Sequence, residues 1–153
     1  MKKLKLLLAA VITTSLSFAQ MDLPPSGGNP RAMVSEEVGI TSITIKYSRP
    51  DVNKREGKIF GDGNRVPYGF KEQNFLTGKA DAPWRAGANE ATMISFEHDV
   101  KVEGKDIKAG TYALFMALGA DKVTLIFSNQ LDAWGSFSYK PEDDVLRVDV
   151  NPV

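Results

Sequence analysis

Cysteine is absent from this 153-residue chain. Without it the chain forms no disulfide, has no thiol nucleophile and offers no thiolate to a metal. A lipid anchor attached through an N-terminal cysteine is excluded for the same reason. Histidine is nearly absent as well, because His98 is the only one. A structural zinc site needs several His or Cys ligands, so none is expected here.

The chain also lacks a surplus of positive charge. Its 19 Lys and Arg residues equal its 19 Asp and Glu residues in number. Three of the lysines fall within the first five residues, so from residue 20 onward 16 basic residues face 19 acidic ones, a net charge of −3. Proteins that bind phosphate backbones carry basic patches. Nucleic acid is therefore not expected as a partner.

Long apolar runs are missing beyond the N-terminus. There, a lysine-rich start precedes the mainly apolar residues 6–16, which are fewer than the roughly 20 that a membrane-spanning helix needs. Small residues follow at Ser17 and Ala19. This pattern predicts a secretory signal peptide over residues 1–19, cleaved before Gln20. We therefore expect an exported protein, periplasmic or extracellular, that does not span the membrane.

Residues 20–33 are rich in Pro and Gly, which predicts a flexible lead-in to a single domain over residues 34–153. No stretch of ten or more residues has the period of an amphipathic helix, whereas short alternating stretches recur. Strands are expected around residues 43–47, 94–96, 100–102, 112–118, 123–127, 137–139 and 146–150.

These patterns indicate how the strands are arranged. Residues 112–118 are apolar at both parities, which predicts a central strand covered on both faces. Residues 103–106 read as a hairpin turn. Residues 49–83 are rich in Gly and poor in apolar residues, and predict one long irregular loop. The predicted fold class is all-β, a single antiparallel β-sandwich or barrel-like domain with that one long loop.

Residues 83–92 are the strongest candidate for a site. They place Arg85, Asn89 and Glu90 among small residues directly before a strand, and Gly87 can adopt a positive φ. An Arg side chain offers a fork of donors for carboxylates or phosphates, Glu serves as acid, base or ligand, and Asn both donates and accepts. The alternative is a structural network in which Arg85 pairs with Glu90 and Asn89 caps a turn.

Further side chains extend this candidate site. Arg49 follows a predicted strand and is expected to join it. Tyr68, Trp84 and Trp134 offer ring faces to a glycan, or else close the ends of the core. The candidate ligand-binding set is Arg49, Tyr68, Trp84, Arg85, Asn89, Glu90 and Trp134.

Other polar residues favour ordinary structural roles. The oxygen-bearing side chains at residues 62–64 and 142–144 could hold calcium, but neither segment has the spacing of a calcium loop, and turns favour the same residue types. His98 is expected at the surface, and no Gly-x-Ser-x-Gly motif accompanies it. We expect no metal and no cofactor.

A series of short motifs follows one another along the chain. They are Tyr-Ser-Arg-Pro at 47–50, Lys-Ile-Phe-Gly at 58–61, Val-Pro-Tyr-Gly at 66–69, Trp-Arg-Ala-Gly-Ala-Asn-Glu-Ala-Thr at 84–92, Asp-Val-Lys-Val-Glu-Gly-Lys at 99–105, Ala-Gly-Thr-Tyr at 109–112, Trp-Gly at 134–135 and Arg-Val at 147–148. In this order they resemble a bacterial family, domain of unknown function 2911, which is typical of exported proteins from Bacteroidetes-type bacteria.

The resemblance covers about residues 34–153 and implies an exported, mostly β domain without a defined activity. In the family the Pro-Tyr-Gly motif is followed within a few residues by Trp-Arg. Here residues 70–83 intervene, and this insertion is expected to cover or reshape a site formed by Arg85, Asn89 and Glu90.

Three functions remain open at this point. The first is a non-enzymatic binding module for a small polar or anionic ligand or a glycan. The second is a hydrolase or lyase in which Glu90 is the acid or base and Arg85 stabilises negative charge. The third is a structural or interaction module of the cell envelope. The sequence leaves the oligomeric state open.

Overall fold

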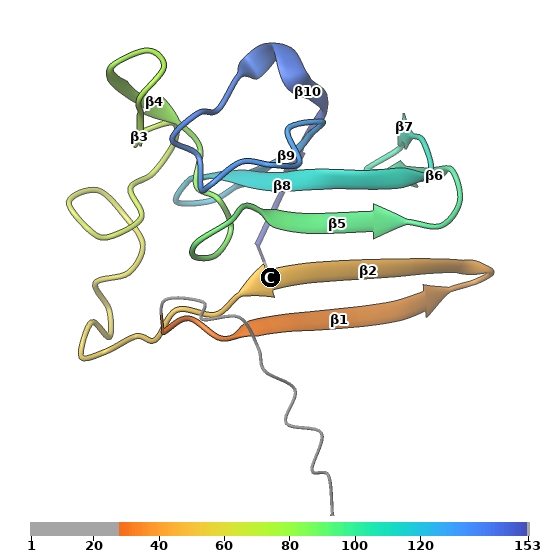
Figure 1. The fold of residues 1–153 in the computed structure, drawn as a ribbon, viewed down its shortest axis with the longest axis horizontal. Helices are drawn as coiled ribbons and strands as arrows, with labels where there is room; N and C mark the ends of the chain where they lie inside the picture. The colour runs from red at the N-terminus through yellow and green to blue at the C-terminus, as the bar shows by residue number, and fades with distance from the viewer. Residues whose placement is uncertain (1–27, 153) are drawn as a thin grey trace, which may run out of the picture.

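The computed structural model describes residues 28–152, so the expected signal peptide and most of the expected lead-in lie outside the described residues. The described part holds ten strands and the short 3-10 helix η1 (Pro141–Asp143), arranged as in Figure 1. The strands are β1 (Arg31–Val38), β2 (Thr41–Ser48), β3 (Glu72–Asn74), β4 (Lys79–Ala82), β5 (Thr92–Phe96), β6 (Val100–Val102), β7 (Lys105–Ile107), β8 (Gly110–Leu118), β9 (Val123–Ser128) and β10 (Asp144–Val150).

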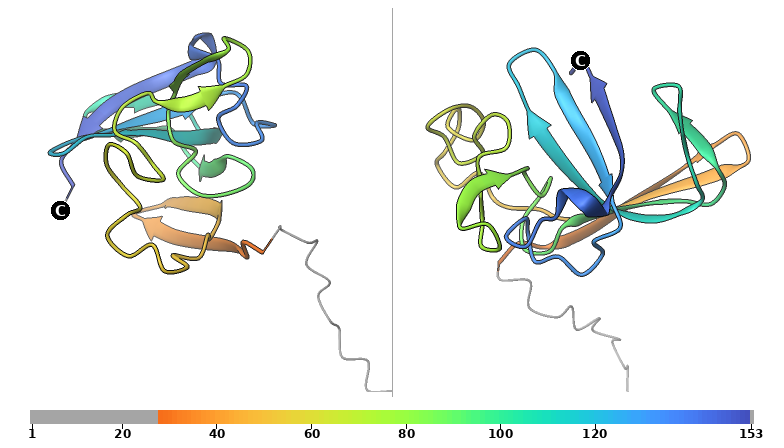
Figure 2. Two further views of the ribbon diagram at one scale, coloured as in Figure 1. Left: turned by 90° about the vertical axis from the view of Figure 1, so that its left-hand side faces the viewer. Right: turned by 90° about the horizontal axis from the view of Figure 1, so that it is seen from above.

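Six strands form one antiparallel sheet in the order β1-β2-β5-β8-β9-β10. The other four make two hairpins, β3–β4 and β6–β7. The large sheet is strongly twisted, so that β1 and β2 cross the direction of β10 (Figure 2). The predicted all-β, antiparallel class is confirmed. The open sheet with its two hairpins is consistent with the predicted sandwich.

The first face of the sheet carries one apolar core. Alternate residues of the strands point to this face, because successive side chains of a strand lie on opposite sides. The β6–β7 hairpin adds Ile107 to it. The buried members are Ile94, Phe96, Ile107, Tyr112, Leu114, Phe127 and Val148.

The second face carries another core over β8 and β9. There Ala113, Phe115 and Ile126 pack with Tyr139 from the loop over residues 131–140. Phe70 from the long loop packs against the same cluster. Strand β8 is therefore covered on both faces, as its apolar run predicted.

Toward β1 the second face changes character and carries a row of hydroxyl groups. The strand register aligns Ser35, Thr44, Ser95 and Thr111 across four strands. The Ser35 and Thr44 hydroxyl oxygens lie 2.8 Å apart, as do those of Ser95 and Thr111. These side chains are exposed or half-buried, so this half of the face is open to solvent.

The hairpin turn predicted at residues 103–106 is confirmed. Glu103 and Gly104 have φ values of 49° and 76° and lie between β6 and β7. Two successive residues with positive φ are the mark of a type I′ turn, which matches the twist of the two strands.

Three details of the predicted chain path differ in the structure. Strand β1 begins at Arg31, so the strand reaches three residues further toward the N-terminus than the expected start of the domain. The long loop is not wholly irregular, because β3 and β4 pair within it. The strand predicted at residues 137–139 is wrong. Gly135 has a φ of 71°, and the Tyr139 amide donates to the Ser136 carbonyl at 3.2 Å, which closes a turn instead.

A buried polar network ties that turn to β10. The Tyr139 hydroxyl donates to Asp144 Oδ2 at 2.6 Å, and Arg147 Nε donates to the same oxygen at 2.7 Å. Arg147 Nη2 also donates to the Tyr139 hydroxyl at 2.8 Å. The Asp144 side chain is 7% exposed, and these donors compensate for the burial of its carboxylate. Burial raises the pKa of Tyr139, and the adjacent Asp144 carboxylate raises it further.

Replacing Tyr139 with Phe keeps the buried ring and removes the hydroxyl from this network. We expect Tyr139→Phe to lower the free energy of unfolding by about 1–3 kcal/mol, because the buried Asp144 loses a donor. Urea unfolding measures the change. Tyr68→Phe, which removes a hydroxyl outside the network, is the control, and equal losses in the two variants would contradict the prediction.

Candidate functional site

Residues 84–92 fold into a compact loop between β4 and β5. Trp84 exchanges two backbone hydrogen bonds of 2.8 Å with Met116, beyond the end of the β5–β8 pairing. The loop closes where the Thr92 amide donates to the Arg85 carbonyl at 3.2 Å and the Thr92 hydroxyl donates to the Ala86 carbonyl at 2.9 Å. These hydrogen bonds hold both ends of the loop against the sheet and thereby position its polar side chains.

The small residues of this loop serve a purpose different from the predicted one. Positive φ values fall on Ala86 (56°) and Asn89 (60°), and not on Gly87. Gly87 instead permits close packing, since a Cβ there would lie 3.1 Å from both the Ser48 carbonyl oxygen and the Thr92 hydroxyl. The loop therefore presses against the end of β2.

Arg85 extends from this loop onto the loop over residues 131–140. Its guanidinium carbon lies 4.6 Å from the centre of the Phe137 ring, and Nη1 donates to the Asn89 carbonyl at 3.0 Å. Gly135 makes room for the guanidinium, because a Cβ at that position would clash with it. Burial lowers the pKa of Arg85, opposed by its attraction to Glu72. The side chain is thus packed as part of the fold.

The expected insertion, residues 70–83, lies against this arginine. It contains the β3–β4 hairpin, whose Phe75 ring stacks on Phe137 with ring centres 4.8 Å apart. Asn74 is buried and its Nδ2 donates to the Tyr139 carbonyl at 2.9 Å. The hairpin therefore packs on the loop over residues 131–140, whose Phe137 ring also holds Arg85.

Glu90 points elsewhere, toward β1. Its carboxylate forms an ion pair with the Arg31 guanidinium, and the two side chains are 40% and 49% exposed. Asn89 accepts a hydrogen bond on Oδ1 from Asn29 Nδ2 at 3.1 Å. Arg85 and Glu90 take different partners, so the residues of the candidate site divide between two places.

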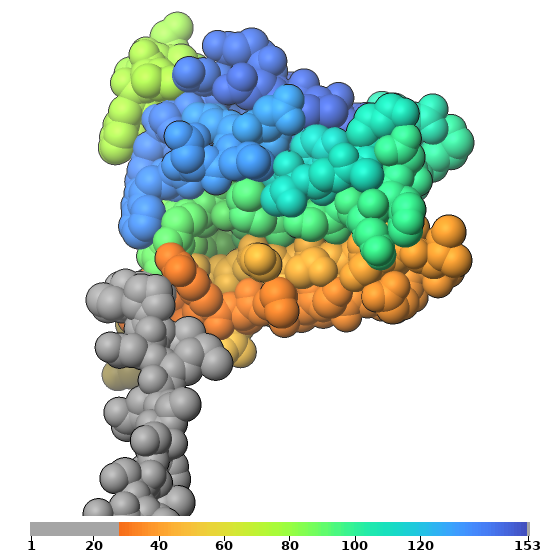
Figure 3. Space-filling view, turned by 45° about the vertical axis from the view of Figure 1, so that its right-hand side comes forward, coloured from red at the N-terminus to blue at the C-terminus, as the bar shows by residue number. Residues whose placement is uncertain are grey.

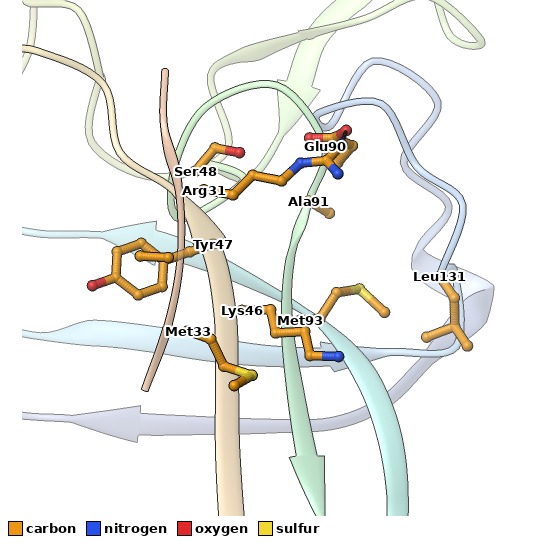
Figure 4. Close-up of a pocket in the computed structure, with 10 residues that line it drawn as sticks. Arg31, Met33, Lys46, Tyr47, Ser48, Glu90, Ala91, Met93 and Leu131 are labelled. Carbon is orange, nitrogen blue, oxygen red and sulfur yellow. Dashed lines mark hydrogen bonds and ion pairs between the residues drawn. The ribbon is translucent and has the colours of Figure 1, made fainter. Parts of the chain in front are cut away.

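A pocket of about 470 Å³ opens beside the Arg31–Glu90 pair on the second face of the sheet. In Figure 4 these two side chains point toward each other at one end of it, while Met33, Lys46 and Met93 lie further along the strands. We call it the methionine pocket. Its main side chains are Arg31, Met33, Lys46, Glu90, Met93 and Leu131.

Neighbouring strands position the pocket's side chains. The register aligns Met33 of β1, Lys46 of β2 and Met93 of β5 in one row. Leu131 approaches from the loop over residues 131–140. Two cations and one carboxylate give the pocket a charge of +1 between apolar walls. Thioether chains are flexible and polarisable, so such walls adapt to ligands of different shape.

The remaining predicted side chains lie outside this pocket. Arg49 is exposed just after β2, and its amide donates to the Pro30 carbonyl at 2.9 Å. Trp84 packs edge-to-face on Phe60, with ring centres 5.5 Å apart. Tyr68 is half-buried in the long loop, next to Gly61. Trp134 is 56% exposed. The three aromatic residues are not part of one ring platform in the pocket.

Other polar groups have local partners. Asp62 accepts from Lys71 Nζ at 2.7 Å, which lowers the pKa of Asp62. His98 is exposed, with Nδ1 3.4 Å from the Thr41 hydroxyl. Within residues 28–152, no three His, Asp or Glu side chains gather in a metal-binding arrangement. No helix in the same range is long and apolar enough to cross a membrane.

Sequence reasoning missed Arg31, Met33, Lys46, Met93 and Leu131. The sequence places Arg31 and Met33 in the predicted lead-in, Lys46 and Met93 in or beside predicted strands, and Leu131 in a polar loop between two of them. One usable signal was present in the alternation of β2 and β5. Lys46 and Met93 occupy the parity opposite to the core positions Ile45 and Ile94, which places them on the other face.

A sequence profile described as "Protein of unknown function (DUF2911)" matches residues 29–153. The chain belongs to this family. The DUF2911 match includes every strand of the described structure and every side chain of the methionine pocket. No curated protein and no solved structure matches the chain.

Arg85 and Glu90, which both belong to the loop over residues 84–92, are expected to differ in their effect on stability. Arg85→Ala should lower the free energy of unfolding by about 2–3 kcal/mol, because a packed, hydrogen-bonded cation is lost. Glu90→Gln should change it by less than about 1 kcal/mol, because its ion pair is exposed. Urea unfolding measures both, with Arg49→Ala as the exposed arginine control. A larger loss for Glu90→Gln than for Arg85→Ala would contradict this division.

Glu72 gives a prediction that depends on pH. Burial raises its pKa, and attraction to Arg85 and Arg65 offsets this only in part. The folded state therefore binds the Glu72 proton more tightly than the unfolded state, and stability falls as pH rises through the range above the usual glutamate pKa. We expect Glu72→Gln to be more stable than wild type at neutral pH, with the gain lost as pH falls to the usual glutamate pKa of about 4.3.

Thermal unfolding at neutral and acidic pH tests this expectation. Glu142→Gln replaces an exposed carboxylate and is the control. A Glu72→Gln protein less stable than wild type at neutral pH would show that the attraction to the two arginines outweighs burial.

Proposed function

We propose that this DUF2911 protein is a non-enzymatic binding module that holds a small amphipathic anion in the methionine pocket. The observation that carries the proposal is one pocket of about 470 Å³ with thioether and aliphatic walls and an excess cation. Pockets of roughly 300–1,000 Å³ with mainly apolar walls and a few placed polar groups are typical ligand sites.

The walls favour an apolar ligand body. Met33 is 64% exposed and Leu131 is 49% exposed, although both are large apolar side chains. Burying such surface against a ligand is favourable, at roughly 25 cal/mol for each Å² removed from water. An apolar body of a ligand would therefore gain most beside these two side chains and Met93.

The charges favour an anionic head group. Lys46 is exposed in the middle of the row, and Arg31 already holds one carboxylate, that of Glu90. A ligand carboxylate or sulfonate near Lys46 would neutralise the pocket's net positive charge. An Arg fork can also bind a second oxyanion through its remaining donors.

The Arg31–Glu90 pair contributes little to folding, since both side chains are 40% or more exposed. Polar groups that a fold does not need, held beside an apolar pocket, are the pattern expected of a ligand site. This supports a binding role over a purely structural one for Glu90, whereas Arg85 fits the structural alternative.

The enzymatic alternative requires Glu90 and Arg85 to act on one reacting group. Arg85 lies on Phe137 and Glu90 pairs with Arg31, so the arrangement favours binding. A glycan is the second candidate ligand, favoured by the adjoining hydroxyl row of Ser35, Thr44, Ser95 and Thr111. Together with the expected signal peptide over residues 1–19, the proposal is an exported binding protein of the periplasm or cell exterior.

The fluorescent anion anilinonaphthalene sulfonate is a suitable probe, because it joins an aromatic body to one negative charge. We expect it to bind the folded protein at one site. Lys46→Gln and Met33→Gln should each weaken that binding by about fivefold to tenfold, equivalent to about 1–1.4 kcal/mol. Decanoate should displace the probe more effectively than decanol or decylamine. Fluorescence titration measures each dissociation constant.

Lys79→Gln is the matched control, since Lys79 is an exposed lysine on β4 away from the pocket. Urea unfolding confirms that each variant is folded, because this probe also binds partly unfolded proteins. Equal affinity in all three variants, or preference for the amine, would overturn the proposal. Displacement by oligosaccharides and not by decanoate would favour the glycan instead.

A further inference from the structure

The two edges of the six-stranded sheet are protected very differently. At the β10 edge, Lys105 of the β6–β7 hairpin donates through Nζ to the Arg147 carbonyl at 2.9 Å. The register with β9 shifts between Asp144 and Leu146, which breaks the regular ladder. A covering hairpin, a lysine and a bulge are the devices by which natural proteins prevent edge pairing.

The β1 edge has none of these devices within residues 28–152. Its eight residues pair with β2 in an unbroken register, from Arg31 opposite Ser48 to Val38 opposite Thr41. No described strand pairs with the other side of β1, and this strand lies at the lower border of the coloured, described part in Figures 1 and 3. Met33, Val34 and Val38 are 55–64% exposed along it.

We propose that a second copy of this chain pairs along β1, antiparallel, so that one sheet runs through both copies. The order of charged and apolar residues in β1 is the reason for proposing a second copy as the partner. Positive charge stands at its beginning in Arg31, apolar residues stand in the middle, and negative charge stands toward its end in Glu36 and Glu37. Such a strand is complementary to itself when the second copy runs in the opposite direction.

The sequence also fixes the register. With Val34 opposite Val34 of the second copy, Arg31 stands opposite Glu37 and Met33 stands opposite Ser35. Directly opposed residues of antiparallel strands lie on the same face, so both Arg31–Glu37 pairs form on the second face. A parallel arrangement in register would instead oppose like charges. The two-fold axis closes the assembly at two copies.

This arrangement also brings the two methionine pockets together. Met33 and Arg31 line one wall of each pocket, and the second copy would add its Ser35 and Glu37 beside them. The pocket remains open on the second face, because the new strand lies beside β1 and not over it. Pairing is therefore compatible with ligand binding and does not depend on it.

Sedimentation equilibrium of the purified protein tests the proposal. We expect a concentration-dependent dimer. Val34→Lys places two lysines opposite each other at the axis and should raise the dissociation constant by at least about tenfold. Val38→Lys is the matched control, since Val38 is 58% exposed against 55% for Val34 and lies outside the paired centre. It should leave the dimer intact.

A charge exchange tests the register itself. Glu37→Arg should weaken the dimer, and Glu37→Arg combined with Arg31→Glu should recover it. Circular dichroism checks that each variant is folded. A protein that stays monomeric up to about 100 μM, where even modest interfaces associate, would overturn the proposal. So would a Val34→Lys dimer as strong as wild type, a double variant without recovery, or growth into open-ended assemblies.

Discussion

Covering both faces of an open six-stranded sheet is the constraint on which the rest of this structure depends. The described chain has no α-helix to lay over the sheet, so cover comes from hairpins and loops. The β6–β7 hairpin closes the first face, while the β3–β4 hairpin and the loop over residues 131–140 close the second face over β8 and β9. Beyond them, β1 is exposed along nearly its whole length and β2 is mostly half-buried. The methionine pocket and the unprotected edge both lie on this uncovered part of the sheet.

The motif at residues 84–92 lies across the border between the covered and the uncovered parts of the sheet. Arg85 lies on the covered side, where its guanidinium packs on Phe137 beside Gly135, and Phe75 of the insertion stacks on the same ring. Glu90, five residues later, lies on the bare side with Arg31. A single run of polar residues thus contributes one side chain to packing and another to a solvent-exposed pocket. The turn at Ala86 and Asn89, both with positive φ, allows the chain to present them in two directions.

Local patterns were enough to predict much of the fold. The run at residues 112–118, the type I′ turn at Glu103 and Gly104, and the alternation of β10 each report on neighbours in the sequence. Phe137 and Tyr139 alternate in the same way but lie in a turn, which is why the strand predicted at residues 137–139 was wrong. The pocket could not be predicted in the same way. Arg31 meets Glu90 across 59 positions, and Met33 joins Met93 only through the register of three strands. Such proximity is a property of strand pairing, which the period of one strand does not reveal.

The β1–β2 hairpin is attached to the rest of the molecule by a short seam. Four residue pairs, from Ile43 with Phe96 to Lys46 with Met93, join β2 to β5, and β1 is exposed along nearly its whole length. Segments with few buried contacts open at a lower free-energy cost than the core and exchange their amide hydrogens sooner. The hairpin is therefore the part of this domain expected to open at the lowest free-energy cost. Because Arg31, Met33 and Lys46 lie on it, any molecule bound there would also hold closed the part of the fold that opens first.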